Sequence, residues 1–172
     1  MRAHFIAMVI SGMLWANWGA AFGASTLLKE INASTASSNP NSFICLGNLV
    51  IFKAFTALEG EELWVSDGTT ANTTLLKDIY AGATGSSIAN LTLSGNFIFF
   101  TANTLANGNQ LWRTDGTTNG TIMLALPTGN SNSTPALLTD VNGILFFVAT
   151  DGTTGLELCR STGLTGAANT FV

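Results

Sequence analysis

The side chains best suited to chemistry in this chain are carboxylates near its middle. Glu59, Glu61 and Glu62 lie close together, and Asp151 follows much later in the sequence. A glycosidase uses two carboxylates separated by roughly 5–10 Å, so Glu59 or Glu61 together with Asp151 could form such a pair. A cluster of acids in a loop is also typical of a solvated surface. An extracellular carbohydrate-active enzyme is therefore kept as the alternative function.

Histidine chemistry depends on one residue near the N-terminus. Arg2 and His4 begin the chain, an apolar run follows, and small residues gather up to Ala24. This order is typical of a secretory signal peptide, which we predict over residues 1–24. Its removal would leave no histidine, hence no serine–histidine pair and no zinc held by histidine. We expect neither a metal nor another cofactor, and a secreted or cell-surface location.

The composition favours a folded protein that does not bind nucleic acid. Charged residues make up 9% of the chain and hydrophobic residues 47%, which excludes intrinsic disorder. With 6 Lys+Arg against 10 Asp+Glu and a net charge of −4, the chain lacks the basic stripe of a nucleic-acid-binding surface. No stretch after residue 24 is long enough to span a bilayer. We expect a membrane span only if the N-terminal segment stays attached as an anchor.

An internal repeat fills residues 25–172. Similar segments recur about 48 residues apart, and such a period is the mark of solenoids, propellers and arrays. The repeat phases lie near residues 27–74, 75–121 and 122–172. The matching segments are 27–31 with 75–79, 47–54 with 95–102 and 142–149, and 62–69 with 110–117 and 157–163.

Each repeat is expected to contain four short strands joined by turns. In the second repeat these strands are residues 90–93, 97–102, 110–113 and 121–126. Residues 27–31 correspond to the fourth strand of a repeat rather than the first. Four antiparallel strands in about 48 residues match the size of one β-propeller blade. We therefore predict an all-β, β-propeller-like array of three four-stranded antiparallel blades.

A known bacterial repeat is similar to the segment around Trp64. Residues 62–69 read ELWVSDGT, and residues 110–117 read QLWRTDGT. These segments resemble the ELWxxDGT repeat of large bacterial exported and surface proteins. The resemblance covers residues 25–172 and implies a propeller-like fold in an extracellular or surface setting. It implies no reaction, because the family's motif carries no established catalytic residues.

The repeated motif residues are expected to have structural roles. Trp64 and Trp112 recur at one position and should pack between adjacent sheets, the alternative being a ligand-stacking aromatic. Asp67-Gly68 and Asp115-Gly116 should form tight reversals, in which Asp accepts hydrogen bonds and Gly takes a positive φ. Calcium binding by the aspartates is the alternative.

The two cysteines and two lysines leave further alternatives open. Cys45 and Cys159 could form one disulfide in an exported protein, or each could be a buried free thiol. Cys159 stands where the earlier repeats carry Trp. Lys29 and Lys77 are expected to be edge-strand charges that discourage aggregation.

The favoured function is a secreted or cell-surface, non-catalytic binding or scaffold module, with a glycan or a protein as its ligand. Closed propellers have about 4–8 blades, so three repeats predict an incomplete ring. Two explanations remain open: the sequence is a fragment of a longer repeat protein, or a homo-oligomer closes the ring between chains.

Overall fold

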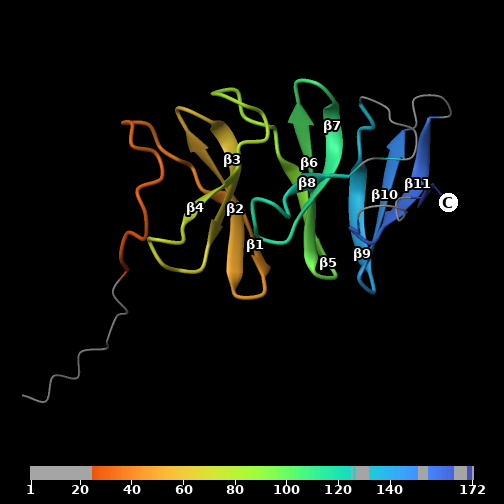
Figure 1. Ribbon diagram of the computed structural model, residues 1–172, viewed down its shortest axis with the longest axis horizontal. Coiled ribbons are helices and arrows are strands. Elements are labelled where there is room, and N and C mark those ends of the chain that lie inside the picture. The colour runs from red at the N-terminus through yellow and green to blue at the C-terminus, as the bar shows by residue number, and fades with distance from the viewer. Residues whose placement is uncertain (1–24, 125, 127–131, 151–154, 165–169, 172) are drawn as a thin grey trace, which may run out of the picture.

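The molecule is a row of β-sheets. The computed structural model describes residues 25–124, 126, 132–150, 155–164 and 170–171, and every regular element among them is a β-strand. The strands form three antiparallel sheets that stand side by side along the long axis of the molecule (Figure 1). The predicted all-β class with repeated antiparallel sheets is confirmed. The predicted signal peptide and Asp151 lie outside the described residues.

Each sheet is built from four consecutive strands, so sheet order follows sequence order. The first sheet contains β1 (Asn41–Leu46), β2 (Leu49–Thr56), β3 (Gly60–Ser66) and β4 (Thr74–Lys77). The second contains β5 (Ala89–Ser94), β6 (Phe97–Thr104), β7 (Gly108–Thr114) and β8 (Ile122–Met123). The third contains β9 (Ala136–Val141), β10 (Ile144–Thr150), β11 (Leu156–Ser161) and β12 (Thr170–Phe171). The described part of the chain holds no helix long and apolar enough to cross a membrane.

The strand register repeats from sheet to sheet. Phe52 lies opposite Trp64, Phe100 opposite Trp112 and Phe147 opposite Cys159. Aromatic and β-branched residues suit these pleated, buried strands. The sequence repeat is therefore also a repeat of hydrogen-bonding register.

Two of the predicted strands differ from the structure. The fourth strand of the second sheet, β8, is only Ile122–Met123, shorter than the predicted residues 121–126. Residues 27–31 form no strand, because no described strand lies beside them to complete a ladder. They are held over the first sheet instead, where the hydroxyl of Thr70 donates to the carbonyl oxygen of Leu28 at 2.7 Å.

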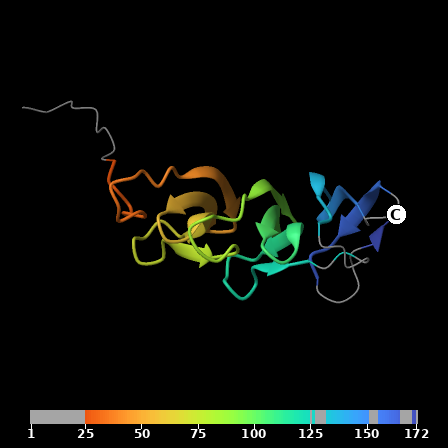
Figure 2. The ribbon, with the colours of Figure 1, turned by 90° about the horizontal axis from the view of Figure 1, so that it is seen from above.

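Neighbouring sheets pack face to face, and the view from above shows them stacked along one direction without closing into a ring (Figure 2). We call the face that a sheet turns toward the next sheet in the sequence its forward face, and the opposite face its backward face. The first strands of the sheets are neighbours, since β1 contacts β5 and β5 contacts β9.

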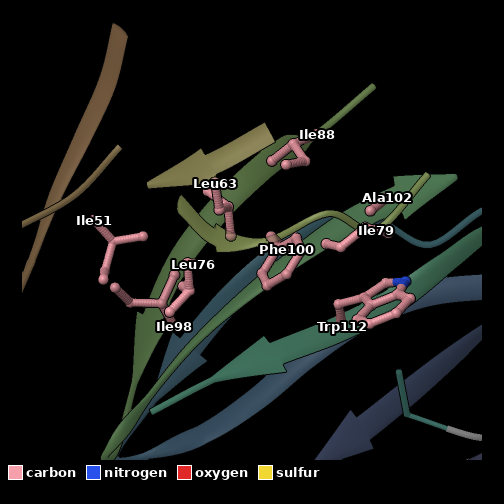
Figure 3. Packing of buried hydrophobic residues seen from close by; sticks show 9 residues of the cluster. All are labelled: Ile51, Leu63, Leu76, Ile79, Ile88, Ile98, Phe100, Ala102 and Trp112. Carbon is pink, nitrogen blue, oxygen red and sulfur yellow. The ribbon is translucent and has the colours of Figure 1, made fainter. Parts of the chain in front are cut away.

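The first interface joins the forward face of the first sheet to the backward face of the second (Figure 3). The forward face supplies Ile51, Leu63, Leu76 and Ile79, and the backward face supplies Ile98, Phe100, Ala102 and Trp112, with Ile88 beside them. The second interface repeats this arrangement with corresponding residues. Those of the second sheet are Phe99, Leu111, Leu124 and Leu126, and those of the third are Leu145, Phe147, Ala149 and Cys159.

One strained backbone position recurs in the first strand of every sheet. Ser42, Asn90 and Leu137 have φ values of 56°, 58° and 56° at the same place in the repeat. The strand register shifts around each of them, as at a β-bulge. Asn tolerates this left-handed conformation, whereas leucine is strained there.

Replacing Leu137 with Asn should therefore stabilise the protein. The side chain of Leu137 is 74% exposed, so little burial is lost, and relief of strain should raise the free energy of unfolding by about 1 kcal/mol. Urea denaturation measures the change. As a control, Leu156→Asn alters another exposed strand leucine without a positive φ and should give no stabilisation. Equal effects of the two substitutions would contradict the strain argument.

Candidate binding groove on the first sheet

In the turn after the third strand, the aspartate accepts hydrogen bonds from other residues of the same turn. One carboxylate oxygen of Asp67 accepts hydrogen bonds from the backbone N–H of Thr69 at 2.9 Å and from its hydroxyl at 2.7 Å. Asp115 accepts the same two bonds from Thr117 at 2.9 and 2.7 Å. The other oxygen of Asp67 accepts from the amide of Asn72 at 2.6 Å. These bonds give the aspartates a complete role within the turn.

The same hydrogen bonds explain the acidity of both aspartates. Bonds from the side chains of Thr69 and Asn72 lower the pKa of Asp67 below its ordinary value. Partial burial acts to raise the pKa of Asp115, but the hydrogen bonds from Thr117 outweigh it and the pKa is lowered. Among the residues that the structure describes, no three His, Cys, Asp or Glu side chains gather as a metal site would require.

The motif tryptophans lie in the hydrophobic clusters. Trp112 is buried in the first interface and stacks on Phe100 with ring centroids 6.3 Å apart. Trp64 occupies the corresponding place on the backward face of the first sheet, against Phe52 and Ala54. Trp64 is 8% exposed and Trp112 6%, which leaves neither ring open for a ligand to stack on.

Lys77 lies on the edge strand β4 of the first sheet and also contacts the second sheet. Its ammonium group lies 5.8 Å from the centre of the Trp112 ring and donates to the carbonyl oxygen of Thr121 at 2.8 Å. The predicted place of Lys77 on an edge strand agrees with the structure, whereas Lys29 lies in no described strand; a role against aggregation stays a prediction. The sequence did not show the contact with Trp112, because it crosses from one sheet to the next.

The three glutamates of the acidic segment have separate surroundings. Glu61 forms an ion pair with Lys53 at 3.0 Å, and Glu59 accepts a hydrogen bond from the hydroxyl of Thr56. Glu62 is fully buried and accepts hydrogen bonds from the Ser86 hydroxyl at 2.6 Å and the Tyr80 N–H at 3.2 Å. Burial raises the pKa of Glu62 to about 7, although these hydrogen bonds act to lower it.

Glu62 belongs to a repeated contact that sequence reasoning missed. In the second repeat, Gln110 corresponds to Glu62 and accepts from the hydroxyl of Ser133 at 2.8 Å. Ser86 and Ser133 each lie in the segment that leads to the next sheet. The backbone carbonyls of these serines accept from Asn103 and Thr150 in that next sheet, at 2.7 and 2.9 Å. The signal in the sequence was a Glu or Gln followed by Ser at nearly constant spacing.

The two cysteines are not joined. Both are free thiols: Cys45 is exposed on β1, and Cys159 is buried on β11. Burial raises the pKa of Cys159 to about 11, so this thiol stays protonated and does not act as a nucleophile at neutral pH. The disulfide that the sequence left open is absent.

Glycines allow close approach between neighbouring sheets at the third-strand turn. A Cβ atom at Gly116 would lie 2.7 Å from a methyl carbon of Leu49, in the preceding sheet. A Cβ atom at Gly163 would lie 2.7 Å from the Phe97 ring and 2.9 Å from the Phe99 ring, also in the preceding sheet. At Gly68, in the first sheet, no such neighbour lies within 4 Å.

An open groove lies where Gly68 lacks a neighbour. The groove has a volume of about 460 Å³ and runs between residues 27–31 and the backward face of the first sheet. Leu27, Leu28 and Ile31 line one side, and Phe43, Val50, Phe52 and the Asp67-Gly68 turn line the other. In the second and third sheets the corresponding face is covered by the sheet before it. This groove, largely apolar and open to a partner, is the candidate binding site.

Comparison of the chain with protein-family models, curated proteins and solved structures finds no match. The similarity of residues 62–69 and 110–117 to the ELWxxDGT repeat therefore remains a resemblance.

The raised pKa of Glu62 makes stability depend on pH. As the pH rises, the unfolded chain, with a carboxyl pKa near 4.5, releases the proton of Glu62 at a lower pH than the folded protein, in which the pKa is about 7. This contribution is present below pH 4.5 and is lost as the pH rises to about 7. Glu62→Gln, which places the amide of Gln110 at the equivalent position, should therefore be more stable than the native protein by on the order of 2 kcal/mol above pH 7.

Urea unfolding at several pH values measures this difference. The reciprocal variant Gln110→Glu should introduce a further loss of stability in the same pH window. A difference between the native protein and Glu62→Gln that stays constant with pH would show that the buried carboxyl is not the cause.

The close approach between sheets gives a second, separate prediction. Gly68 and Gly163 have φ values of 90° and 77°, so alanine is strained at both. Only Gly163→Ala also collides with the Phe97 and Phe99 rings, and its free energy of unfolding should fall about 1–3 kcal/mol further than that of Gly68→Ala. Thermal unfolding of the two variants tests this. Equal losses would show that the third sheet does not pack on these rings.

Proposed function

We propose that this protein is a secreted or cell-surface, non-catalytic binding and scaffold module, built of propeller-like blades, whose ligand is a protein. The four-stranded sheets, their face-to-face packing and the adjacency of β1, β5 and β9 support the blade arrangement. The resemblance to exported and surface repeat proteins supports the location.

The apolar groove on the first sheet is the observation that carries the protein-binding assignment. Phe43 is 63% exposed and Leu27 77% exposed at the groove. Neighbouring exposed apolar side chains of this size mark interaction sites. A glycan, by contrast, is recognised largely by polar side chains that bond to its hydroxyl groups, and the lining of this groove is largely apolar.

A smaller hollow gives a glycan a second candidate site. It measures about 290 Å³, and its lining combines polar side chains, including Asn32, Thr56 and Glu59, with apolar ones such as Leu58 and Trp64. A sugar hydroxyl would find hydrogen-bond partners there in Asn32, Thr56 and Glu59.

The alternative of a carbohydrate-active enzyme has less support. Glu61 is already paired with Lys53, and Glu59 accepts a hydrogen bond from the hydroxyl of Thr56. Neither carboxylate is presented to the groove, and Asp151 lies outside the described residues.

Dye binding and a glycan array separate these candidates. At low protein concentration the apolar dye ANS should bind the groove and fluoresce. Phe43→Ser and Leu27→Ser should each reduce this fluorescence at least twofold, while the control Leu105→Ser, in an exposed loop residue, should not. The array should show no bound glycan.

Three results would overturn the assignment. The first is dye fluorescence that is unaffected by both groove variants. The second is glycan binding that Glu59→Gln abolishes. The third is release of reducing sugar from a polysaccharide that Glu59→Gln or Glu61→Gln abolishes while the circular dichroism spectrum is unchanged.

A further inference from the structure

The two outer sheet faces, at the ends of the row, differ from the corresponding faces inside it in how far they are covered. The backward face of the first sheet and the forward face of the third are covered by no other described sheet. Every corresponding face within the molecule is covered. The internal interfaces therefore show what each outer face is shaped to contact.

On the backward face of the first sheet, Phe52, Ala54 and Trp64 are buried, but two apolar side chains that a preceding sheet would cover are left exposed or half-buried. Phe43 corresponds to Leu91 and Leu138, which are partly buried against the first and second interfaces. Val50 is half-buried, whereas its counterparts Ile98 and Leu145 are fully buried. Ile31 already packs against this face, as Ile79 and Leu126 do in the internal interfaces.

On the third sheet, the forward face exposes the matching side chains. Leu158 is 47% exposed, whereas its counterparts Leu63 and Leu111 are both 0% exposed. Phe146 is half-buried, and corresponds to the buried Ile51 and Phe99. These are the residues that fill the backward face of the next sheet in each internal interface.

The polar contact between repeats has one member on each outer face. Glu157 corresponds to Glu62 and Gln110, but it is exposed. Ser38 corresponds to Ser86 and Ser133, and its carbonyl oxygen accepts from the Phe55 N–H at 2.8 Å, just as theirs accept in the later sheets. The first sheet thus carries the serine and the third sheet carries the acceptor.

We propose that the forward face of the third sheet binds the groove on the first sheet of a second copy of this chain. Leu158 and Phe146 of one copy enter the groove beside Phe43 and Val50 of the next, and Ser38 donates to Glu157 across the contact. The proposal rests on the assignment of the groove as a protein-binding site and names the protein that occupies it.

This contact joins two different surfaces, so each copy keeps one free surface after binding. Such head-to-tail contacts build closed rings or open chains of copies. Apolar area supplies the driving force, since burial of each large aliphatic or aromatic side chain is favourable by about 1.5–3 kcal/mol. The hydrogen bond from Ser38 to Glu157 sets the register of the two copies.

The full chain, expressed for secretion and purified, is tested by light scattering coupled to size-exclusion chromatography at several concentrations. The native protein should show a mass that exceeds one chain and rises with concentration. Leu158→Arg and Phe43→Arg, one on each surface, should each be monomeric. The control Leu105→Arg, at a side chain that is 86% exposed in a loop, should associate like the native protein.

Mixing the two monomeric variants is the decisive measurement. Leu158→Arg keeps an intact groove, and Phe43→Arg keeps an intact third sheet, so the mixture should form one dimer and no larger species. Ser38→Ala should weaken the association of the native chain about fivefold, the loss of one hydrogen bond.

Two outcomes would overturn the proposal: a native protein that is monomeric at every concentration, or a mixture of the variants that forms no dimer. The dye experiment shows what else has failed in that event. If Phe43→Ser still reduces dye fluorescence, the groove remains a binding site and only the second copy is wrong. If it does not, the protein-binding assignment fails as well.

Discussion

Each sheet of this molecule has two apolar faces, and exposure of either face to water is unfavourable. Within the row, the side chains of one forward face fill the next backward face, and Ile51, Leu63, Phe99 and Leu111 are completely shielded as a result. The remaining features follow from this need for cover. Turns carry glycine where sheets approach closely, and residues 27–31 lie over the first sheet where no sheet precedes it among the described residues.

Several polar side chains form hydrogen bonds that join one sheet to the next. Glu62 and Gln110 hold the segment that leads to the next sheet through Ser86 and Ser133. Lys77 spans the first interface to reach the carbonyl of Thr121. These contacts fix the orientation of one sheet on the next, which apolar packing alone specifies less strictly.

The sequence predicts the strands better than the surfaces between them. The repeated blocks identified corresponding positions, and the strand register of Phe52, Phe100 and Phe147 follows them. The sequence shows Glu62 only as part of an acidic segment. The fold places Ser86 against this glutamate, and the hydrogen bond from the serine stabilises the buried carboxyl group. The groove could not be predicted either, because it lies where no described sheet covers Val50 and Phe52.

Sheet order that follows sequence order has a kinetic consequence. Every strand pairing in the described structure joins consecutive strands, so no pairing must wait for a distant part of the chain. Loop closure is therefore inexpensive, and folding of such an array nucleates locally and spreads from one unit to its neighbour. A chain that emerges progressively, from a ribosome or through a membrane pore, can complete each sheet as its own strands appear and then add it to the sheet already formed.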